Sequence, residues 1–276
     1  MARFQCDVAI EALPRPWLED FVHSLFDRAE SLALDGDGWV EDVEELADVT
    51  LVEGEHLTAG ARYQRHNARL DADGEVQDEG GTTTELVITS WNRRGEVSAE
   101  ITTWLDDDEK ITWTVRLRSP EKAEKASAGG TYQGHKRWRR LTWAIRFDAG
   151  QWWKAAEGRA WGRRDEPAMA MLRHPLAEAV LRIRPKTAGD RNWRVGVTLT
   201  VRGRSWARPV VAIFLPFVRR RLRNEFRKVV ADVAKQWNEQ IPGIRELDPR
   251  QAEIWFPVIQ ADREELDRWI AEQGNS

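Results

Sequence analysis

Cysteine is almost absent from this 276-residue chain, and its single thiol, Cys6, cannot close a disulfide within the chain. The longest apolar run, Pro209 to Val218, is too short to span a bilayer. The residues before Leu13 lack the cationic start and apolar stretch of a secretory signal. We therefore expect no transmembrane segment, a reducing compartment and a cytoplasmic location.

Motifs for catalysis, metal binding and cofactor binding are missing too. The five histidines, at positions 23, 56, 66, 135 and 174, form none of the spacings that bind zinc, and there is no glycine-rich phosphate loop. Gly203 to Ala207 lies close to the G-x-S-x-G elbow of hydrolases, but no histidine follows Ser205 to act as its base. The sequence therefore predicts no metal, no cofactor and no assignable catalytic residue.

What the chain does have is enough apolar residues for a core, at 41%, together with 32% charged residues, which is typical of a globular protein. Its charge is divided along the chain. Residues 1–109 carry a net charge of −19, residues 110–240 a net charge of +19, and residues 241–276 a net charge of −4. This asymmetry is explained either by attraction between the two halves or by a basic surface for nucleic acid, and we favour the first.

Residues 1–118 alternate between apolar and polar side chains in short segments separated by turn signals, which predicts antiparallel strands. Within residues 1–118, apolar residues recur at helical spacing only from Leu18 to Leu32, which predicts one helix there. Residues 119–136 are polar and rich in glycine and indicate a loop, and residues 148–178 give no clear pattern. The expected strands are 4–13, 47–52, 60–66, 82–91, 96–105, 110–118, 141–147, 179–183 and 192–202.

The strongest periodic signal is an apolar stripe from Val211 to Trp237, whose members recur every three or four residues. It predicts one long amphipathic helix, with a kink or a break at Pro216. Beyond Pro242-Gly243, a capping box formed by Asp262 and Glu265 predicts a second, short helix.

This order of elements resembles the START-like superfamily, also called SRPBCC, with its helix-grip fold. Two stretches carry the resemblance: residues 54–63, similar to a strand hairpin of that family, and residues 195–237, similar to its last strand and gripping helix. We therefore expect an α+β domain over residues 1–243, with a curved antiparallel sheet gripping the long C-terminal helix. Residues 119–191 would be an insertion, and residues 244–276 a C-terminal helical extension.

The resemblance implies a cavity between sheet and helix that binds a hydrophobic small molecule, such as a lipid or polyketide. An apolar pocket with few polar groups also suits such a ligand on physical grounds. Arg65 would anchor an anionic group of the ligand through a bidentate contact. From strand parity and the helical stripe, the predicted ligand-binding residues are Tyr63, Arg65, Ile101, Thr103, Trp113, Trp143, Trp193, Phe214 and Val218. For each of them alone, ordinary core packing is the competing interpretation.

Two alternative functions stay open. Residues 136–164 interleave Lys and Arg with Trp, the combination that single-stranded nucleic acid binding uses, although stacking of Arg on Trp within the protein explains it more simply. An aromatase or cyclase of the polyketide type is the enzymatic version of the cavity hypothesis. It requires an ionisable group inside the cavity, and Arg65 is the one candidate that the pattern offers.

Overall fold

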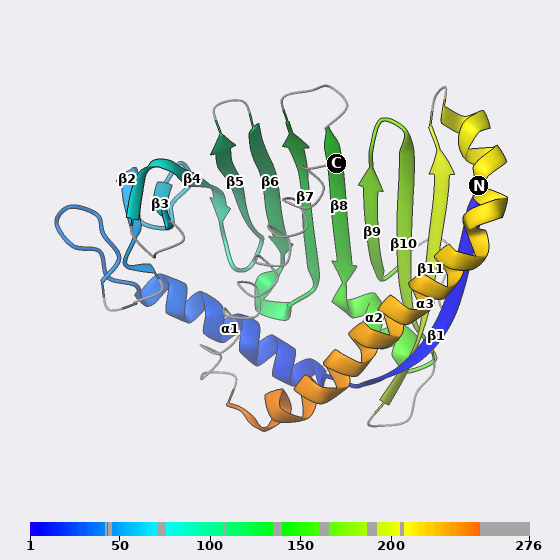
Figure 1. Cartoon of the computed structure of the whole chain (residues 1–276). Helices are drawn as coiled ribbons and strands as arrows, with labels where there is room; N and C mark the ends of the chain where they lie inside the picture. Colours follow the sequence, from blue (N-terminus) through cyan, green and yellow to red (C-terminus); the bar gives the residue numbers. More distant parts are fainter. Residues whose placement is uncertain are drawn as a thin grey trace.

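The computed structural model describes residues 1–41, 43, 46–70, 76–106, 109–134, 140–159, 166–186, 192–204 and 207–248. Within these residues, eleven strands form one antiparallel sheet in the order β1-β11-β10-β9-β8-β7-β6-β5-β4-β3-β2, so that β1 and β2 are its edges (Figure 1). The strands are β1 (Ala2–Glu11), β2 (Val49–Glu53), β3 (Arg62–Leu70), β4 (Val76–Trp91), β5 (Glu96–Asp106), β6 (Glu109–Arg118), β7 (Lys125–Gln133), β8 (Leu141–Asp148), β9 (Ala168–Arg173), β10 (Ala177–Lys186) and β11 (Asn192–Gly203).

The described α-helices are α1 (Arg15–Ser31), α2 (Ala149–Ala156) and α3 (Ala207–Glu246), and they lie on the same face of the curved sheet (Figure 1). We call this the inner face and the opposite one the outer face. A proline lies in the first turn of α1, and the Asp148 side chain caps α2 by accepting a hydrogen bond from the Gln151 amide at 2.9 Å. The α+β prediction, with a curved antiparallel sheet and one long C-terminal helix, is confirmed.

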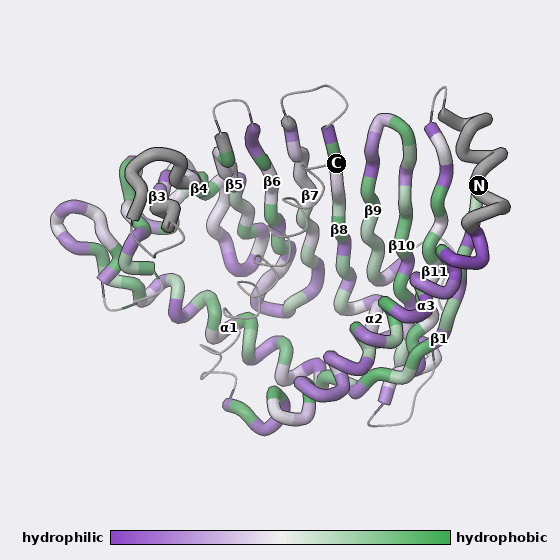
Figure 2. The backbone as a smooth tube through the Cα atoms, in the orientation of Figure 1, coloured by the Kyte–Doolittle hydropathy of each residue, from purple (hydrophilic) through white to green (hydrophobic). Residues whose placement is uncertain are grey.

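Alternation of side chains decides which residues face the helices. Along β11 the odd-numbered residues from Trp193 to Val201 are apolar, and the even-numbered ones are mostly polar. The register joins these inner-face positions across the sheet in unbroken rows from β6 to β1, since no shift occurs in that part of the ladder. The alternation is visible along the tube in Figure 2.

The loop predicted over residues 119–136 is wrong, because half of that segment is strand β7. Gly130 pairs with Trp113 on one side and Trp143 on the other, and a Cβ at this position would lie 2.7 Å from the Trp113 Cβ. Glycine is therefore required here by the two neighbouring indoles, whose ring centroids are 6.2 Å apart. The composition of the segment reflects this close approach and not a turn.

The predicted insertion, residues 119–191, supplies β7, β8, α2, β9 and β10. These strands follow one another in the same sheet between β6 and β11, so the segment enlarges the sheet instead of standing apart from it. Part of the segment without a clear pattern, residues 148–178, contains helix α2 and strand β9.

Helix α3 is continuous through Pro216 and through Pro242-Gly243, so a break at Pro216 is not found and the boundary expected after residue 243 falls inside the helix. Ile241 and Ile244 are buried around that boundary, whereas Pro242 is exposed. Packing on both sides of the proline holds the last turns in helical form. The short helix predicted around Asp262 lies outside the described residues.

In the part of the chain that the structure describes, no helix combines the length and apolar character needed to cross a membrane.

Candidate ligand cavity

An apolar cavity of about 680 Å³ lies on the inner face between one end of the sheet and helices α2 and α3. The sheet wall comes from β1, β8, β9, β10 and β11, and α1 adds Leu18. The residues that line it are Val8, Ile10, Leu13, Leu18, Phe147, Trp152, Trp153, Ala168, Leu181, Ile183, Trp193, Val195, Val197, Leu199, Phe226, Val229, Val230, Val233, Ala234 and Trp237.

Aromatic rings form the wall where α2 meets the sheet. The ring of Trp152 packs on Phe147 at 5.6 Å and edge-on against Trp193 at 5.5 Å, and Trp153 meets Trp193 edge-on at 5.9 Å, all measured between ring centroids. Edge-to-face contacts of this kind are favourable and rigid. The cap at Asp148 fixes the start of α2 directly after β8, and this places both tryptophans over the sheet.

One polar atom in this wall lacks a partner. The Trp152 side chain is 7% exposed, and its Nε1–H makes no hydrogen bond among the described residues. Buried indole N–H groups normally find an acceptor, because an unsatisfied donor costs about 1 to 3 kcal/mol. The wall therefore holds a donor whose hydrogen bond is unmade.

The opposite wall is the C-terminal half of α3. Phe226, Val230 and Ala234 are partly or fully buried, whereas Val229 and Val233 are 57% and 59% exposed. Two exposed valines that line the same apolar space show that the cavity opens to solvent on the α3 side.

Polar contacts hold α3 to the edge strand β1 beside this opening. The Trp237 Nε1–H donates to the Glu11 carbonyl at 2.8 Å, and Asn238 accepts from the Glu11 amide at 2.7 Å and donates to the Ala9 carbonyl at 3.1 Å. These side chains satisfy backbone groups that an edge strand would otherwise leave unpaired. The helix is therefore fixed at its C-terminal part.

No side chain among the described lining residues is ionisable. A titratable residue in the same core is Cys6, which packs against the cluster that contains Trp152, Trp193 and Val195. Burial raises the pKa of this thiol above its ordinary value, and the nearby Arg227 charge opposes the rise only in part. The cavity is an uncharged space that favours hydrocarbon surface.

In the structure, seven of the predicted ligand-binding residues lie on the inner face. Tyr63 lies in one cross-strand row with Ile101, Trp113 and Trp143, and Arg65 lies with Thr103 in the neighbouring row. Of these seven residues only Trp193 lines the cavity. The side chains of Phe214 and Val218, on the N-terminal half of α3, lie outside the described residues.

Arg65 is placed far from the cavity, because β3 is next to the opposite edge of the sheet. Its Nε donates to Asp48 at 2.7 Å, and the side chain is about one-third exposed. Thr103 forms a hydrogen bond with Thr84 at 3.1 Å. The expectation that Arg65 lines the cavity is therefore not met in this structure.

Tyr63 is buried and joins the β2–β3 loop to α1 through a polar chain. The Leu57 amide donates to the Tyr63 hydroxyl at 2.8 Å, the hydroxyl lies 2.8 Å from His56 Nδ1, and His56 Nε2 lies 3.0 Å from the Ala29 carbonyl. Because a carbonyl only accepts, His56 carries its proton on Nε2, and in the neutral ring Nδ1 accepts from Tyr63. Burial raises the pKa of Tyr63, so the hydroxyl stays a donor.

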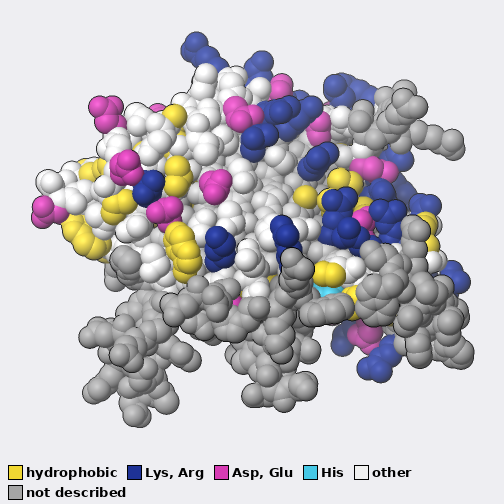
Figure 3. Space-filling model, turned by 90° about the horizontal axis from the view of Figure 1, so that it is seen from above, with side chains coloured by type: hydrophobic (Ala, Val, Ile, Leu, Met, Phe, Trp, Pro, Cys, Tyr) yellow, Lys and Arg dark blue, Asp and Glu magenta, His cyan; other side chains and the backbone are white. Residues whose placement is uncertain are grey.

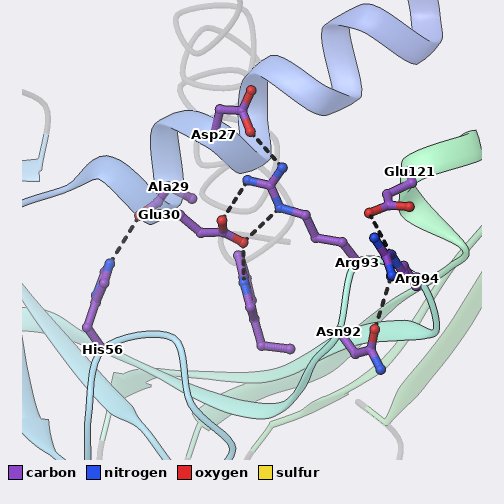
Figure 4. A network of polar contacts seen from close by, with 9 residues as sticks. Asp27, Ala29, Glu30, His56, Asn92, Arg93, Arg94 and Glu121 are labelled. Carbon is purple, nitrogen blue, oxygen red and sulfur yellow. Dashed lines mark hydrogen bonds and ion pairs between the residues drawn. The ribbon is translucent and has the colours of Figure 1, made fainter.

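A second polar group ties α1 to the β4–β5 turn, and Figure 4 shows it beside His56. Arg93 donates from Nε and Nη2 to the two carboxylate oxygens of Glu30 at 2.7 and 2.8 Å, and from Nη1 to Asp27 at 2.6 Å. Trp91 Nε1 adds a hydrogen bond to Glu30 at 2.9 Å. Burial alone would raise the pKa of Glu30, but the hydrogen bonds from Arg93 and Trp91 outweigh burial and leave that pKa below its ordinary value.

Strand β8, within residues 136–164, places its tryptophan and its arginine on opposite faces of the sheet. Trp143, Trp152 and Trp153 lie on the inner face, while Arg146 on β8 points to the outer face. Residues 135–139 and 160–165 lie outside the described part. Along β8, the interleaving that suggested stacking on nucleic acid is therefore divided between the two faces of the sheet, whereas the exposed Lys154 follows Trp153 directly on α2.

The basic half of the chain keeps much of its charge at the surface. Seen along the strands, Lys and Arg side chains gather over the half of the molecule that carries β8 to β11 (Figure 3). Direct pairs between the oppositely charged halves are few among the described residues. They are Asp7 with Lys186 at 2.6 Å, Glu96 with Arg116 at 3.1 Å and with Arg118 at 3.5 Å, and Glu121 with Arg94 at 3.7 Å.

Searches of protein-family models, of curated proteins and of solved structures each found no match to this chain.

Proposed function

We propose that the protein binds a hydrophobic small molecule in the cavity between β1, β8 to β11, α2 and α3. The observation that carries the proposal is the pairing of volume with chemistry: about 680 Å³ of space with an entirely apolar described lining. This volume is within the range of cavities that hold ligands of drug size, and burial of apolar surface supplies about 25 cal/mol per Å².

The helix-grip architecture of the START-like superfamily is part of the same proposal. A curved antiparallel sheet with its long C-terminal helix across the inner face supports it, as does the place of the cavity between these two elements. The sheet of this chain would then be an enlarged version, in which β7 to β10 are added strands and β8 to β10 with α2 supply part of the pocket wall.

The lining also narrows the class of ligand. Without a cation in the described wall, the ligand is uncharged, which replaces the anionic ligand expected from Arg65. The Trp152 N–H is buried in the wall, so the surface that the lining offers to a ligand is apolar. Because the described lining has no group that exchanges protons, the geometry favours binding over a cyclase reaction.

A fluorescent probe that is neutral and apolar, N-phenyl-1-naphthylamine, tests the proposal. We expect saturable binding to the full chain at one site, and at least tenfold weaker binding by Ala168→Phe, which fills the space with a ring. The matched control is Ala128→Phe, on the same face two strands from β9 and outside the cavity, and it should bind as the wild type does. Equal effects of the two substitutions, or no binding by the wild type, would contradict the proposal.

Ligand class is tested by competition against the bound probe. We expect the methyl ester of a medium-chain fatty acid to displace the probe at least tenfold more effectively than the free carboxylate of the same chain, because the described lining holds no cation to pair with a charge. Equal displacement by the carboxylate would contradict the assignment of an uncharged ligand.

A further inference from the structure

The outer face of the sheet carries a cationic surface that the apolar cavity does not explain. In the described chain no helix covers this face, because α1, α2 and α3 lie on the inner side (Figure 1). From β6 to β1 its carboxylates are Asp7, Glu11, Asp148 and Glu178. Its cations are more numerous: Arg3, Lys110, Arg116, Arg118, Lys125, Arg146, Arg173, Arg182, Arg184, Lys186, Arg194 and Arg202.

Part of this face is hollowed. A cavity of about 620 Å³ lies over β6 to β10, and its charged lining consists of Arg116, Arg118, Lys125, Arg146 and Arg182 against Asp148 and Glu166. It is therefore a concave site in which positive charge predominates, and concave cationic sites concentrate anions.

Three of the five cations already have partners. Arg116 and Arg118 share Glu96, at 3.1 and 3.5 Å, and Lys125 pairs with Asp148 at 3.2 Å. Asp148 is occupied further by the capping hydrogen bond from Gln151.

Arg146 and Arg182 are different, since neither has a carboxylate within 4.0 Å in the described part of the chain. They are placed to act together, because Met169 on β9 pairs with Arg146 on one side and with Arg182 on the other. With neighbouring strands about 4.8 Å apart, their Cα atoms are separated by roughly 10 Å. Two guanidinium groups on flexible stems can converge across that distance above a short apolar floor.

We propose that this outer-face hollow binds a phosphoryl anion, either a phosphate monoester or a diphosphate, with Arg146 and Arg182 as its two clamps. The planar fork of Arg matches the oxygens of phosphate in a bidentate way, and two unpaired forks suit a dianion. Glu166, which also lines the hollow, repels the anion and therefore limits the affinity of the site.

Outer-face positions of β6 to β11 hold no aromatic side chain on which bases would stack, which argues against nucleic acid as the ligand. The site is independent of the apolar cavity.

Isothermal titration of the full chain with sodium pyrophosphate at low ionic strength tests this site directly. We expect saturable binding at one site that Arg146→Met and Arg182→Met each weaken at least tenfold. Arg194→Met removes a cation of the same face outside the hollow and should change binding less than twofold. Glu166→Gln should strengthen binding, which a merely structural role of these residues would not produce.

Sedimentation with vesicles identifies the source of the phosphoryl group. One set contains phosphatidylcholine alone, and the other contains added phosphatidic acid. Pyrophosphate binding with the stated dependence on Arg146 and Arg182 supports a soluble phosphate ligand. Sedimentation only with phosphatidic acid, lost in the same two variants, supports a lipid headgroup.

The proposal is overturned if neither probe binds, if Arg194→Met weakens binding as much as the two clamp variants, or if both clamp variants bind normally. Binding of a single-stranded oligonucleotide that pyrophosphate does not displace would also overturn it. Because Arg146 is exposed, the Arg146→Lys variant should fold normally. Lysine keeps the positive charge but lacks the planar guanidinium, so this variant should bind pyrophosphate with an affinity between those of the wild type and Arg146→Met.

Discussion

The two ends of the inner face are built from the same alternating strands, yet they are covered in different ways. At the end that carries β2 to β5, which we call the filled end, Phe26 of α1 is buried against Trp91, and the polar groups of Arg93 and His56 tie the helix to the sheet. Over β8 to β11 and β1, α3 is fixed by polar contacts at Trp237 and Asn238, and apolar space remains beside them.

The comparison shows that hydrophobic periodicity specifies which face is covered and not how closely. Polar contacts near one end of a helix fix its distance from the sheet, and side-chain volume then decides whether the space between them is full. On β8 and β9, Ile145 and Leu172 of the inner face are 49% and 44% exposed, so the described helices leave part of these strands uncovered.

The largest expected difference between the two ends comes from truncating one phenylalanine in each. Phe26→Ala should lower the free energy of unfolding by about 3 to 5 kcal/mol, because it opens a void in filled packing, and should leave binding of N-phenyl-1-naphthylamine unchanged. Phe226→Ala should cost roughly 1 to 2 kcal/mol, since the ring already borders empty space, but should weaken probe binding. Chemical denaturation and probe titration of both variants check this. Equal losses of stability in the two variants would contradict the proposed difference between the two ends.

At the filled end, Tyr63→Phe should lower the free energy of unfolding by about 1 to 3 kcal/mol, because the Leu57 amide and His56 Nδ1 would lose their shared partner. Leu57 also has a positive φ of 55°, so it depends on its hydrogen bond to hold an uncommon backbone conformation. Urea denaturation measures the effect. A stability equal to that of the wild type would show that the polar chain to Ala29 does not contribute.

The Arg93 group gives the filled end an acid-dependent contribution. Because the folded pKa of Glu30 is lowered, its stabilisation is complete above the ordinary pKa of a glutamate, about 4.3, and is lost as the pH falls through the lowered folded value. Arg93→Met should therefore cost about 1 kcal/mol at pH 7, and the difference from the wild type should shrink below about pH 4. Unfolding curves between pH 3 and pH 7 test this, and a difference independent of pH would refute it.

The smallest effect concerns Cys6 at the cavity end. Since burial raises the pKa of its thiol, less thiolate is present at pH 8 than in a free cysteine, and iodoacetamide should react several-fold more slowly with the folded chain than with a model thiol. Mass spectrometry of the alkylated chain follows the reaction. An equal rate would contradict the raised pKa of Cys6.

Most of the fold could be predicted from the sequence because alternation and helical spacing are local signals. The stripe from Val211 to Trp237 identified α3, and strand parity placed Tyr63, Ile101 and Trp113 on the inner face. Strand β7 could not be identified, because the reason for Gly130 is a contact with two tryptophans on other strands.

The site was harder to predict than the fold. Parity selects a face, but the strands that α3 lies across depend on its contacts with the edge strand β1, which no local pattern specifies. For that reason six of the predicted residues lie on β3 to β8, and among the described cavity lining only Trp193 on β11 had been predicted. Phe226 and Trp237 belong to the apolar stripe of the sequence, and Trp152 and Trp153 are adjacent aromatic residues in it. That these four residues line one cavity depends on the tertiary structure, which no local pattern shows.

The most direct test of the account is a crystal structure of the chain with 1-bromododecane, in which anomalous scattering locates the bromine. We expect the chain of the probe to lie between Trp193 and Phe226, with the bromine inside the cavity, and we expect Ala168→Phe crystals to show no bromine there. A structure in which Trp152, Trp153 and Phe226 close the space, or in which bromine occupies only other sites, would contradict the proposal that this end of the sheet holds a hydrophobic ligand.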